Sequence, residues 1–283
     1  MWTKQLLCWG MICGWLLGLP VIAWGQSRAA SYHDGLMTEY SLKENGCRFL
    51  VHDLDLSSGR VRAAYFAKEG EARYQAWQDR YDRRVLCYFA VGFAKEWEQD
   101  QPPLGLAVEG GTPVNRALDT DMDGLVLIDG QGQVSALHLD QDAAEGTYYL
   151  RRSGQKEAFL RAMRRSRGSA FQTQLMYSRA AGELMGEDKH GKRAARRFLA
   201  ICKDRRGQVH HLIMDLNKAK HLNLAAKAAL QALRNHGYQV EYLLNQDTGS
   251  RNIMAAFDER GRRLYASPVL LAKATQLVVY YVY

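Results

Sequence analysis

Residues 243–254, which read LLNQDTGSRNIM, decide how we interpret the rest of the chain. Apolar residues enter the stretch at Leu243 and continue from Ile253, and the residues between them are mostly polar or small. This pattern predicts a tight turn between two buried elements, with side chains and backbone N–H groups at a protein edge. Gly249 allows close approach of the backbone and Arg251 can pair with a phosphate, so the turn suits an anion or a sugar. A solvated loop without a ligand is the alternative.

The N-terminal segment has the composition of a secretory signal peptide. Lys4 is the one charged residue in residues 1–25; an apolar run follows it, and the segment ends in a small-x-small pattern. We therefore predict cleavage before Gln26, a secreted or periplasmic protein, and no transmembrane segment after cleavage. An uncleaved N-terminal anchor is the alternative, because residues 11–24 are apolar almost throughout.

The chain is basic. Its formal net charge is +8 from 38 Lys and Arg against 30 Asp and Glu, and removing Lys4 with the signal peptide leaves +7. Basic residues concentrate at positions 151–152, 161–167 and 189–197. Such a surface favours anionic partners. For an exported protein we expect an anionic glycan or sugar phosphate and no nucleic acid, whereas charge that only keeps the protein soluble is the alternative.

Three cysteines, Cys47, Cys87 and Cys202, remain after the predicted signal peptide. In an oxidising compartment this odd number allows at most one internal disulfide. All three have apolar neighbours, so three buried free thiols are the alternative. Their wide spacing does not suit a metal site, and we predict no cysteine nucleophile.

Helix and strand patterns are mixed along the chain. Alternating residues predict a hairpin from residues 46–55 and 60–65, and residues 169–177 fit either a helix or a strand. Further predicted strands cover residues 85–91, 124–128, 134–139, 197–202, 209–214, 238–244 and 277–283, and predicted helices cover 71–83, 148–167 and 222–236. We therefore predict one mixed α/β (α+β) domain over residues 46–283, preceded by a flexible segment at 26–45.

A calcium loop is the one candidate cofactor site. Asp119, Asp121 and Asp123 place oxygens at alternate positions before Gly124, as such a loop requires. The twelfth position, however, is Gly130 instead of a bidentate glutamate, so an acidic turn is the alternative. We expect no other metal or cofactor.

Other catalytic motifs are missing from the sequence. The adjacent His210 and His211 lie in a predicted strand, so their side chains point to opposite faces and cannot act on one site. The chain has no Gly-x-Ser-x-Gly elbow, no His-Glu-x-x-His pair and no phosphate-binding loop ending in Gly-Lys-Ser/Thr. These absences argue against serine hydrolases, zincins and nucleotide hydrolases.

A series of segments occurs in the order of a known motif set. They are 88–93 (YFAVGF), 103–111 (PLGLAVEGG), 124–129 (GLVLID), 171–176 (FQTQLM), an arginine at 196 or 197, and 244–252 (LNQDTGSRN). In this order they resemble the phosphodiester glycosidase domain family, the bacterial relatives of the lysosomal uncovering enzyme. The resemblance runs from about Cys47 to the C-terminus.

The resemblance implies hydrolysis of the bond between a sugar's anomeric carbon and a phosphodiester. It implies a catalytic carboxylate at Asp247 and a phosphate-binding arginine at Arg196 or Arg197. The implied substrate-binding residues are Gly92, Phe93, Gln172, Asn245, Gly249, Ser250 and Arg251. The chain also departs from the family pattern: Ala90 or Val91 stands at the turn asparagine, Gly249 alone remains of three glycines, and Arg251 and Asn252 replace two serines.

Two hypotheses follow for this site. The chain is either an exported hydrolase of a sugar-1-phosphodiester in an envelope or exopolysaccharide glycan, or a catalytically degenerate member that binds an anionic glycan. A third reading is an envelope interaction protein that uses the basic segment 148–167. The first two require Gly92, one of the two arginines and Asp247 to converge.

Overall fold

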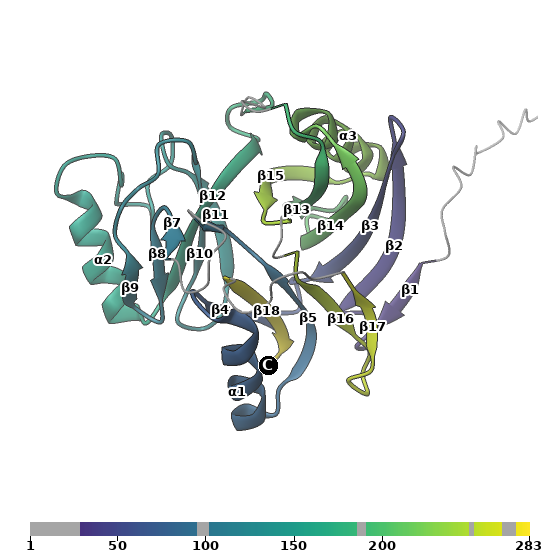
Figure 1. Cartoon of the computed structure of the whole chain (residues 1–283), viewed down its shortest axis with the longest axis horizontal. Helices are drawn as coiled ribbons and strands as arrows, with labels where there is room; N and C mark the ends of the chain where they lie inside the picture. The colour runs from purple at the N-terminus through teal and green to yellow at the C-terminus, as the bar shows by residue number, and fades with distance from the viewer. Residues whose placement is uncertain (1–28, 95–101, 186–190, 249–251, 268–275) are drawn as a thin grey trace, which may run out of the picture.

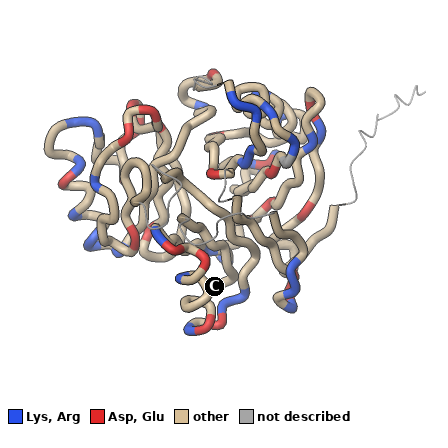
Figure 2. Tube along the Cα trace, in the orientation of Figure 1, with Lys and Arg blue, Asp and Glu red and all other residues tan. Residues whose placement is uncertain are grey.

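The computed structural model describes residues 29–94, 102–185, 191–248, 252–267 and 276–283, so the predicted signal peptide lies outside the described residues (Figure 1). The helices are α1 (Gly70–Tyr81), α2 (Gln155–Ser166) and α3 (Leu222–His236). Among the described residues, each helix is too short or too polar to traverse a lipid bilayer. Lys and Arg gather along α2, at the left of the view in Figure 2.

The larger sheet is antiparallel and has the order β1-β2-β3-β14-β13-β15-β12-β10-β11, with β8 and β9 attached through β12. Its strands are β1 (Ala30–Tyr32), β2 (Met37–Glu44), β3 (Cys47–Asp55), β8 (Ala107–Glu109), β9 (Thr112–Asn115), β10 (Gly124–Ile128), β11 (Val134–His138), β12 (Ser169–Ser178), β13 (Ala194–Lys203), β14 (Val209–Lys220) and β15 (Gln239–Gln246).

The second sheet has the order β17-β16-β5-β18-β4 and is also antiparallel. Its strands are β4 (Val61–Phe66), β5 (Arg84–Ala90), β16 (Met254–Phe257), β17 (Arg263–Ala266) and β18 (Leu277–Val282). A short pair, β6 (Phe93–Ala94) and β7 (Pro103–Leu104), follows the end of β5.

The chain stacks these elements in layers. Helix α3 packs on one face of the larger sheet, the second sheet packs on the other, and α1 packs against β18 and β4 of the second sheet (Figure 1). Because side chains alternate along a strand, Phe198 and Met214 face α3 while Leu199 and Ile213 face the second sheet. The α+β class and the single domain are therefore confirmed.

Several predicted elements are confirmed. Helix α3 has the predicted bounds, since its apolar stripe is buried and Gly237, with φ +97°, ends it. Strands β13 and β14 form the predicted hairpin, and β10 pairs with β11 as expected. The ambiguous segment 169–177 is strand β12.

The hairpin predicted from residues 46–55 and 60–65 is wrong. Strand β3 pairs with β2 and β14, whereas β4 pairs with β18 in the other sheet. The turn between them is closed locally, because Asp55 accepts hydrogen bonds from the backbone and hydroxyl of Ser57. A satisfied turn therefore joins two sheets here instead of two neighbouring strands.

The segment predicted to be flexible, 26–45, contains strands β1 and β2 in its described part. Met37, Tyr40 and Leu42 are buried, so the apolar face of β2 holds the segment against the core. The helix predicted over 148–167 begins only at Gln155, because Gly154, with φ +74°, interrupts it.

All three cysteines of the described residues are free and buried. Cys47 and Cys202 lie in the core under α3, and Cys87 lies between the two sheets. Burial raises the pKa of the Cys87 and Cys202 thiols.

Candidate functional site

Three strand ends that are distant in sequence meet at Ile253. Its carbonyl accepts one hydrogen bond from the Ala90 N–H at the end of β5 and one from Arg197 Nη1 on β13, each 2.8 Å long. Gln246, the last residue of β15, is paired with Arg197 across the sheet. The Gly92 bend, Arg197 and the residue after Gln246, Asp247, therefore lie at one end of the interface between the sheets.

Arg197 is fully buried and bound by protein groups. Its Nε and Nη2 donate to the two carboxylate oxygens of Asp215 at 3.0 and 3.1 Å, and Nη2 also donates to Asn252 Oδ1 at 2.6 Å. Tyr265 donates a further hydrogen bond to Asp215 at 2.6 Å. With the bond from Nη1 to Ile253, four of the five N–H groups of the guanidinium are engaged, and the arginine fixes Asn252 and Ile253 at the start of β16.

Arg196 lies on the opposite face of β13, as alternation along a strand requires. Its Nε and Nη2 donate to the carbonyls of Lys220 and Lys192 at 3.1 and 2.6 Å. The two adjacent arginines therefore cannot serve one site together, and Arg197 is the one that faces the meeting point.

The turn after β15 begins at Asp247, which is partly buried. Thr248 Oγ1 donates to the Ala195 carbonyl at 2.7 Å and ties the turn to the start of β13. Asn245 is buried, pairs with Phe198 on the α3 side, and donates to Gln174 at 2.8 Å. Asn245 thus lies on the face away from Arg197, while the predicted ligand residues Gly249, Ser250 and Arg251 lie outside the described residues.

The Gly92 bend is clamped by Gln276. Gly92 has φ +59°, a conformation that favours glycine, and a Cβ atom there would lie 2.7 Å from Gln276 Oε1 and displace that amide. Gln276 Oε1 accepts from the Tyr65 hydroxyl at 2.6 Å, and its Nε2 donates to the Phe93 carbonyl at 2.9 Å. A side-chain amide therefore does stand at the bend, although no strand pattern in the sequence indicated Gln276.

Gln172 has a structural role in this chain. Its Oε1 accepts the N–H groups of Leu106 and Asp119, and its Nε2 donates to the carbonyls of Asp119 and Met122. The side chain is buried and fully engaged, so it holds the 105–122 segment to β12. It is not at the meeting point of the three strand ends.

The acidic segment 119–123 is arranged as a turn. Asp119 accepts the N–H of Asp121 at 2.8 Å, and Asp123 is bound to Arg151 at 2.6 Å. Within the described part of the chain, the group with metal-ligand spacing is Asp123, His138 and Asp140. Arg151 also contacts Asp140 at 2.8 Å, so a guanidinium bridges the two carboxylates, and the calcium site stays a prediction.

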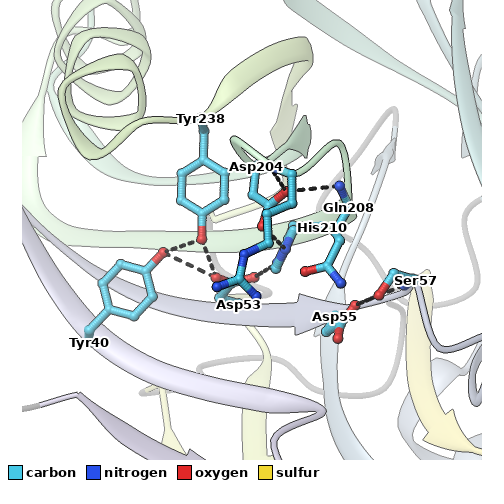
Figure 3. Close-up of polar contacts among 9 residues, drawn as sticks. Tyr40, Asp53, Asp55, Ser57, Asp204, Gln208, His210 and Tyr238 are labelled. Atoms are coloured by element: carbon cyan, nitrogen blue, oxygen red, sulfur yellow. Dashed lines mark hydrogen bonds and ion pairs between the residues drawn. The ribbon is translucent and has the colours of Figure 1, made fainter.

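A second polar cluster lies on the α3 side of the larger sheet, and sequence reasoning missed it (Figure 3). His210 Nδ1 lies 2.8 Å from Asp53 Oδ1, and the Tyr238 hydroxyl donates to Asp53 Oδ2 at 2.5 Å. Tyr40 lies 3.4 Å from both that carboxylate and Tyr238. Burial by itself would lower the pKa of His210, but the hydrogen bond and charge of Asp53, with the charges of Asp55 and Asp204, outweigh it and raise that pKa.

His211 points to the opposite face, which confirms the expectation from alternation. It is fully buried between the sheets, with Nδ1 2.8 Å from the Tyr280 hydroxyl. Burial, with a smaller contribution from His210, lowers the pKa of His211 to about 3. This histidine is therefore neutral at physiological pH.

Comparison with known proteins gives a shared fold. No protein-family model matches the chain, and no curated protein sequence matches it. Among solved structures, the catalytic domain of zebrafish N-acetylglucosamine-1-phosphodiester alpha-N-acetylglucosaminidase, auto-inhibited by its pro-peptide, matches with a TM-score of 0.51 and 12% identity over 91% of this chain and 88% of that one.

A hypothetical protein from Synechocystis also matches, with a TM-score of 0.51 and 14% identity over 87% of this chain. This chain covers 62% of that protein's length. At such identities the likeness establishes the fold alone.

Proposed function

We propose that this chain is an exported hydrolase of the phosphodiester glycosidase type, which cleaves a sugar-1-phosphodiester linkage in an envelope or exopolysaccharide glycan. The observation that carries the proposal is that the Ile253 carbonyl joins Arg197 to the end of β5, two residues before the Gly92 bend, while Gln246, the neighbour of Asp247, is paired with Arg197. The fold shared with the zebrafish glycosidase supports the same reaction class. The signal-like residues 1–25 support export.

In this proposal Asp247 supplies the carboxylate. Cleavage of the bond between the anomeric carbon and the phosphate oxygen builds positive charge on the sugar ring, which a nearby carboxylate stabilises, and water completes the hydrolysis. Backbone N–H groups at the Gly92 bend and the Arg251 guanidinium bind the phosphate.

Arg197 acts as a positioning residue in this scheme. It binds Asn252 Oδ1 and the Ile253 carbonyl, so it orders the segment that directly follows Arg251. Its ion pair with Asp215 is buried, so Asp215 compensates the charge of Arg197.

A second candidate function is binding of an anionic glycan without turnover. Arg197 favours this candidate, because its guanidinium is already bonded to Asp215 and Asn252. In this candidate Arg251 is the cation that binds the phosphate. It is also favoured by Ala90 and Val91, which stand where the resembled family has an asparagine.

The test compares the purified protein with Asp247→Asn on an α-N-acetylglucosamine-1-phosphodiester, with release of the free sugar as the measurement. We expect a loss of about 10²-fold or more in Asp247→Asn, because a positioned carboxylate contributes about that factor. The exposed Asp79→Asn is the matched control. Equal activity in both variants would remove Asp247 from the mechanism.

The same assay separates the two candidates. If the wild-type protein binds the phosphodiester without releasing sugar, and if salt and Arg251→Ala both weaken that binding, the chain is a binding protein. If neither binding nor turnover occurs, both proposals are wrong.

A further inference from the structure

A pocket of about 650 Å³ lies along strand β4, the free edge of the second sheet. Helix α1, the C-terminal end of β18 and the turn between β10 and β11 surround it; α1, β4 and β18 lie close to the C-terminus in Figure 1. The turn is held to the edge by one hydrogen bond, from Ala63 N–H to the Gly132 carbonyl at 2.8 Å. Gly92, Arg197 and Asp247 are not among the residues that line this pocket.

Aromatic side chains from three elements line one side of the pocket: Phe66 of β4, Trp77 of α1, and Tyr281 and Tyr283 at the C-terminus. Trp77 and Tyr281 meet edge to face, with ring centroids 5.1 Å apart. Both are only partly buried, and Tyr283 is 72% exposed. Ring faces that remain accessible at a pocket attract C–H groups, which carry partial positive charge, through their negative faces.

Two guanidinium groups at this pocket have no acidic partner among the described residues. Arg62 makes a long 3.4 Å hydrogen bond to the Val61 carbonyl and lies over the Tyr283 ring at 5.4 Å. Arg167 is exposed and follows α2. Because Arg62 carries its positive charge beside an aromatic ring and Arg167 also lines the pocket, the two together favour an anion that also has an apolar face.

The carboxylates of the pocket are engaged differently. Glu109 is bound to Arg73 and to the Ala67 N–H, so its charge is neutralised. Asp129 Oδ1 accepts the N–H groups of Gln131 and Gln133, which leaves its exposed second oxygen for hydroxyl donors.

We infer that this pocket binds an acidic sugar residue, a hexose ring that carries one carboxylate or phosphate group. The ring's C–H face packs on Trp77 and Tyr281, its acidic group pairs with Arg62 and Arg167, and its hydroxyls donate to Asp129. A hydroxyl-rich ring fits this set better than a nucleotide, because Asp129 offers an acceptor for ring hydroxyls beside the aromatic side chains. The pocket is a subsite outside the proposed reaction centre, and its occupancy does not depend on hydrolysis.

The experiment is calorimetric titration of the full-length protein with glucuronic acid, glucose 6-phosphate, neutral glucose and AMP. We expect both acidic sugars to bind at least about tenfold more tightly than glucose, with binding weakened by salt. Arg62→Gln and Arg167→Gln should each weaken binding about tenfold, as loss of one charged hydrogen bond predicts. Arg161→Gln, an exposed arginine of α2 that does not line the pocket, is the matched control and should bind as wild type.

Four results would overturn the inference: no binding of either acid, equal binding of glucose, tighter binding of AMP, or acid binding that neither variant weakens. Preference between the carboxylate and the phosphate sugar identifies the acidic group, and either preference supports the subsite. Thermal unfolding of each variant verifies that it is folded. Release of sugar from the phosphodiester should be unchanged in Arg167→Gln, so failure here is distinct from failure of the proposed hydrolysis.

Discussion

The two faces of the β13–β14 pair carry two different buried polar networks. On the face toward the second sheet, Arg197 and Asp215 form an ion pair whose side chains are 0% and 1% exposed and whose oxygens are all bonded. On the face toward α3, Asp53 binds His210, whose Nε2 is buried without a hydrogen-bond partner and lies 3.9 Å from Asp204. The first network is built on an arginine–carboxylate pair, whereas the second contains a histidine whose pKa is raised, so the second makes the stability of the fold depend on the protonation of His210.

The largest effect should come from breaking the buried pair of Arg197 and Asp215. Asp215→Ala leaves the Arg197 guanidinium buried without its counter-charge, and we expect a loss of ~3–5 kcal/mol in the free energy of unfolding, measured in urea. Replacing both partners with apolar residues, Arg197→Met with Asp215→Leu, should cost less than the single change. A loss below about 1 kcal/mol for Asp215→Ala would contradict the assignment of a buried pair.

A change in the network of Asp53 and His210 should lower the free energy of unfolding by less. Asp53→Asn keeps the shape of the side chain but removes its charge, so we expect a loss of ~1–3 kcal/mol. The pKa of His210 should fall at the same time, measured by NMR, because Asp53 provides the hydrogen bond and the leading charge that raise it. An unchanged His210 titration in this variant would show that Asp53 is not the cause.

On the face toward the second sheet, His211 should make the fold less stable in acid. The pKa of His211 is lowered to about 3 in the folded chain. The unfolded chain therefore binds a proton at His211 near pH 6.5, whereas the folded chain binds it only near pH 3. The contribution of neutral His211 is complete above pH 6.5 and is lost as the pH falls toward 3. Urea unfolding of wild type and His211→Gln at several pH values should show a difference that shrinks with acid, and a constant difference would be the contrary result.

The smallest effect, with the opposite sign, belongs to His210. Its pKa is raised above 6.5, so protonated His210 stabilises the fold. This contribution is fully present below pH 6.5 and disappears as the pH rises through the folded-state pKa. The stability difference between wild type and His210→Gln should therefore decrease from pH 6 to pH 8, and an increase over that range would refute the sign.

Local patterns in the sequence predicted local structure well. The apolar stripe of α3 and its terminal glycine predicted that helix to the residue, and the short turn at Gly207 predicted the β13–β14 hairpin. Pairing between strands that are distant in sequence was harder to predict. Alternation indicates which face of a strand is buried but not which strand lies beside it. The sequence therefore predicted that β3 pairs with β4, although the two strands belong to different sheets.

The sequence could predict the strand ends that form the candidate site, but it could not predict the side chains that bind them. The resemblance pointed to Gly92, to Arg196 or Arg197, and to Asp247, and the sequence alone did not choose between the two arginines. It gave no indication of Asp215, Asn252 or Gln276, whose contacts to Arg197 and Gly92 arise only when the two sheets pack together. A charged residue within an apolar strand, as Asp215 is, is the kind of signal that could have pointed to a buried partner.

The three buried thiols give the molecule internal reporters of opening. A thiol reacts with an alkylating reagent only when it is exposed and deprotonated, so Cys47, Cys87 and Cys202 stay unmodified while the layers are closed. Cys202 reports detachment of α3, whereas Cys87 reports separation of the two sheets. Mass spectrometry in mild denaturant can follow the order in which the two thiols are labelled. That order identifies whether α3 or the second sheet detaches from the larger sheet first.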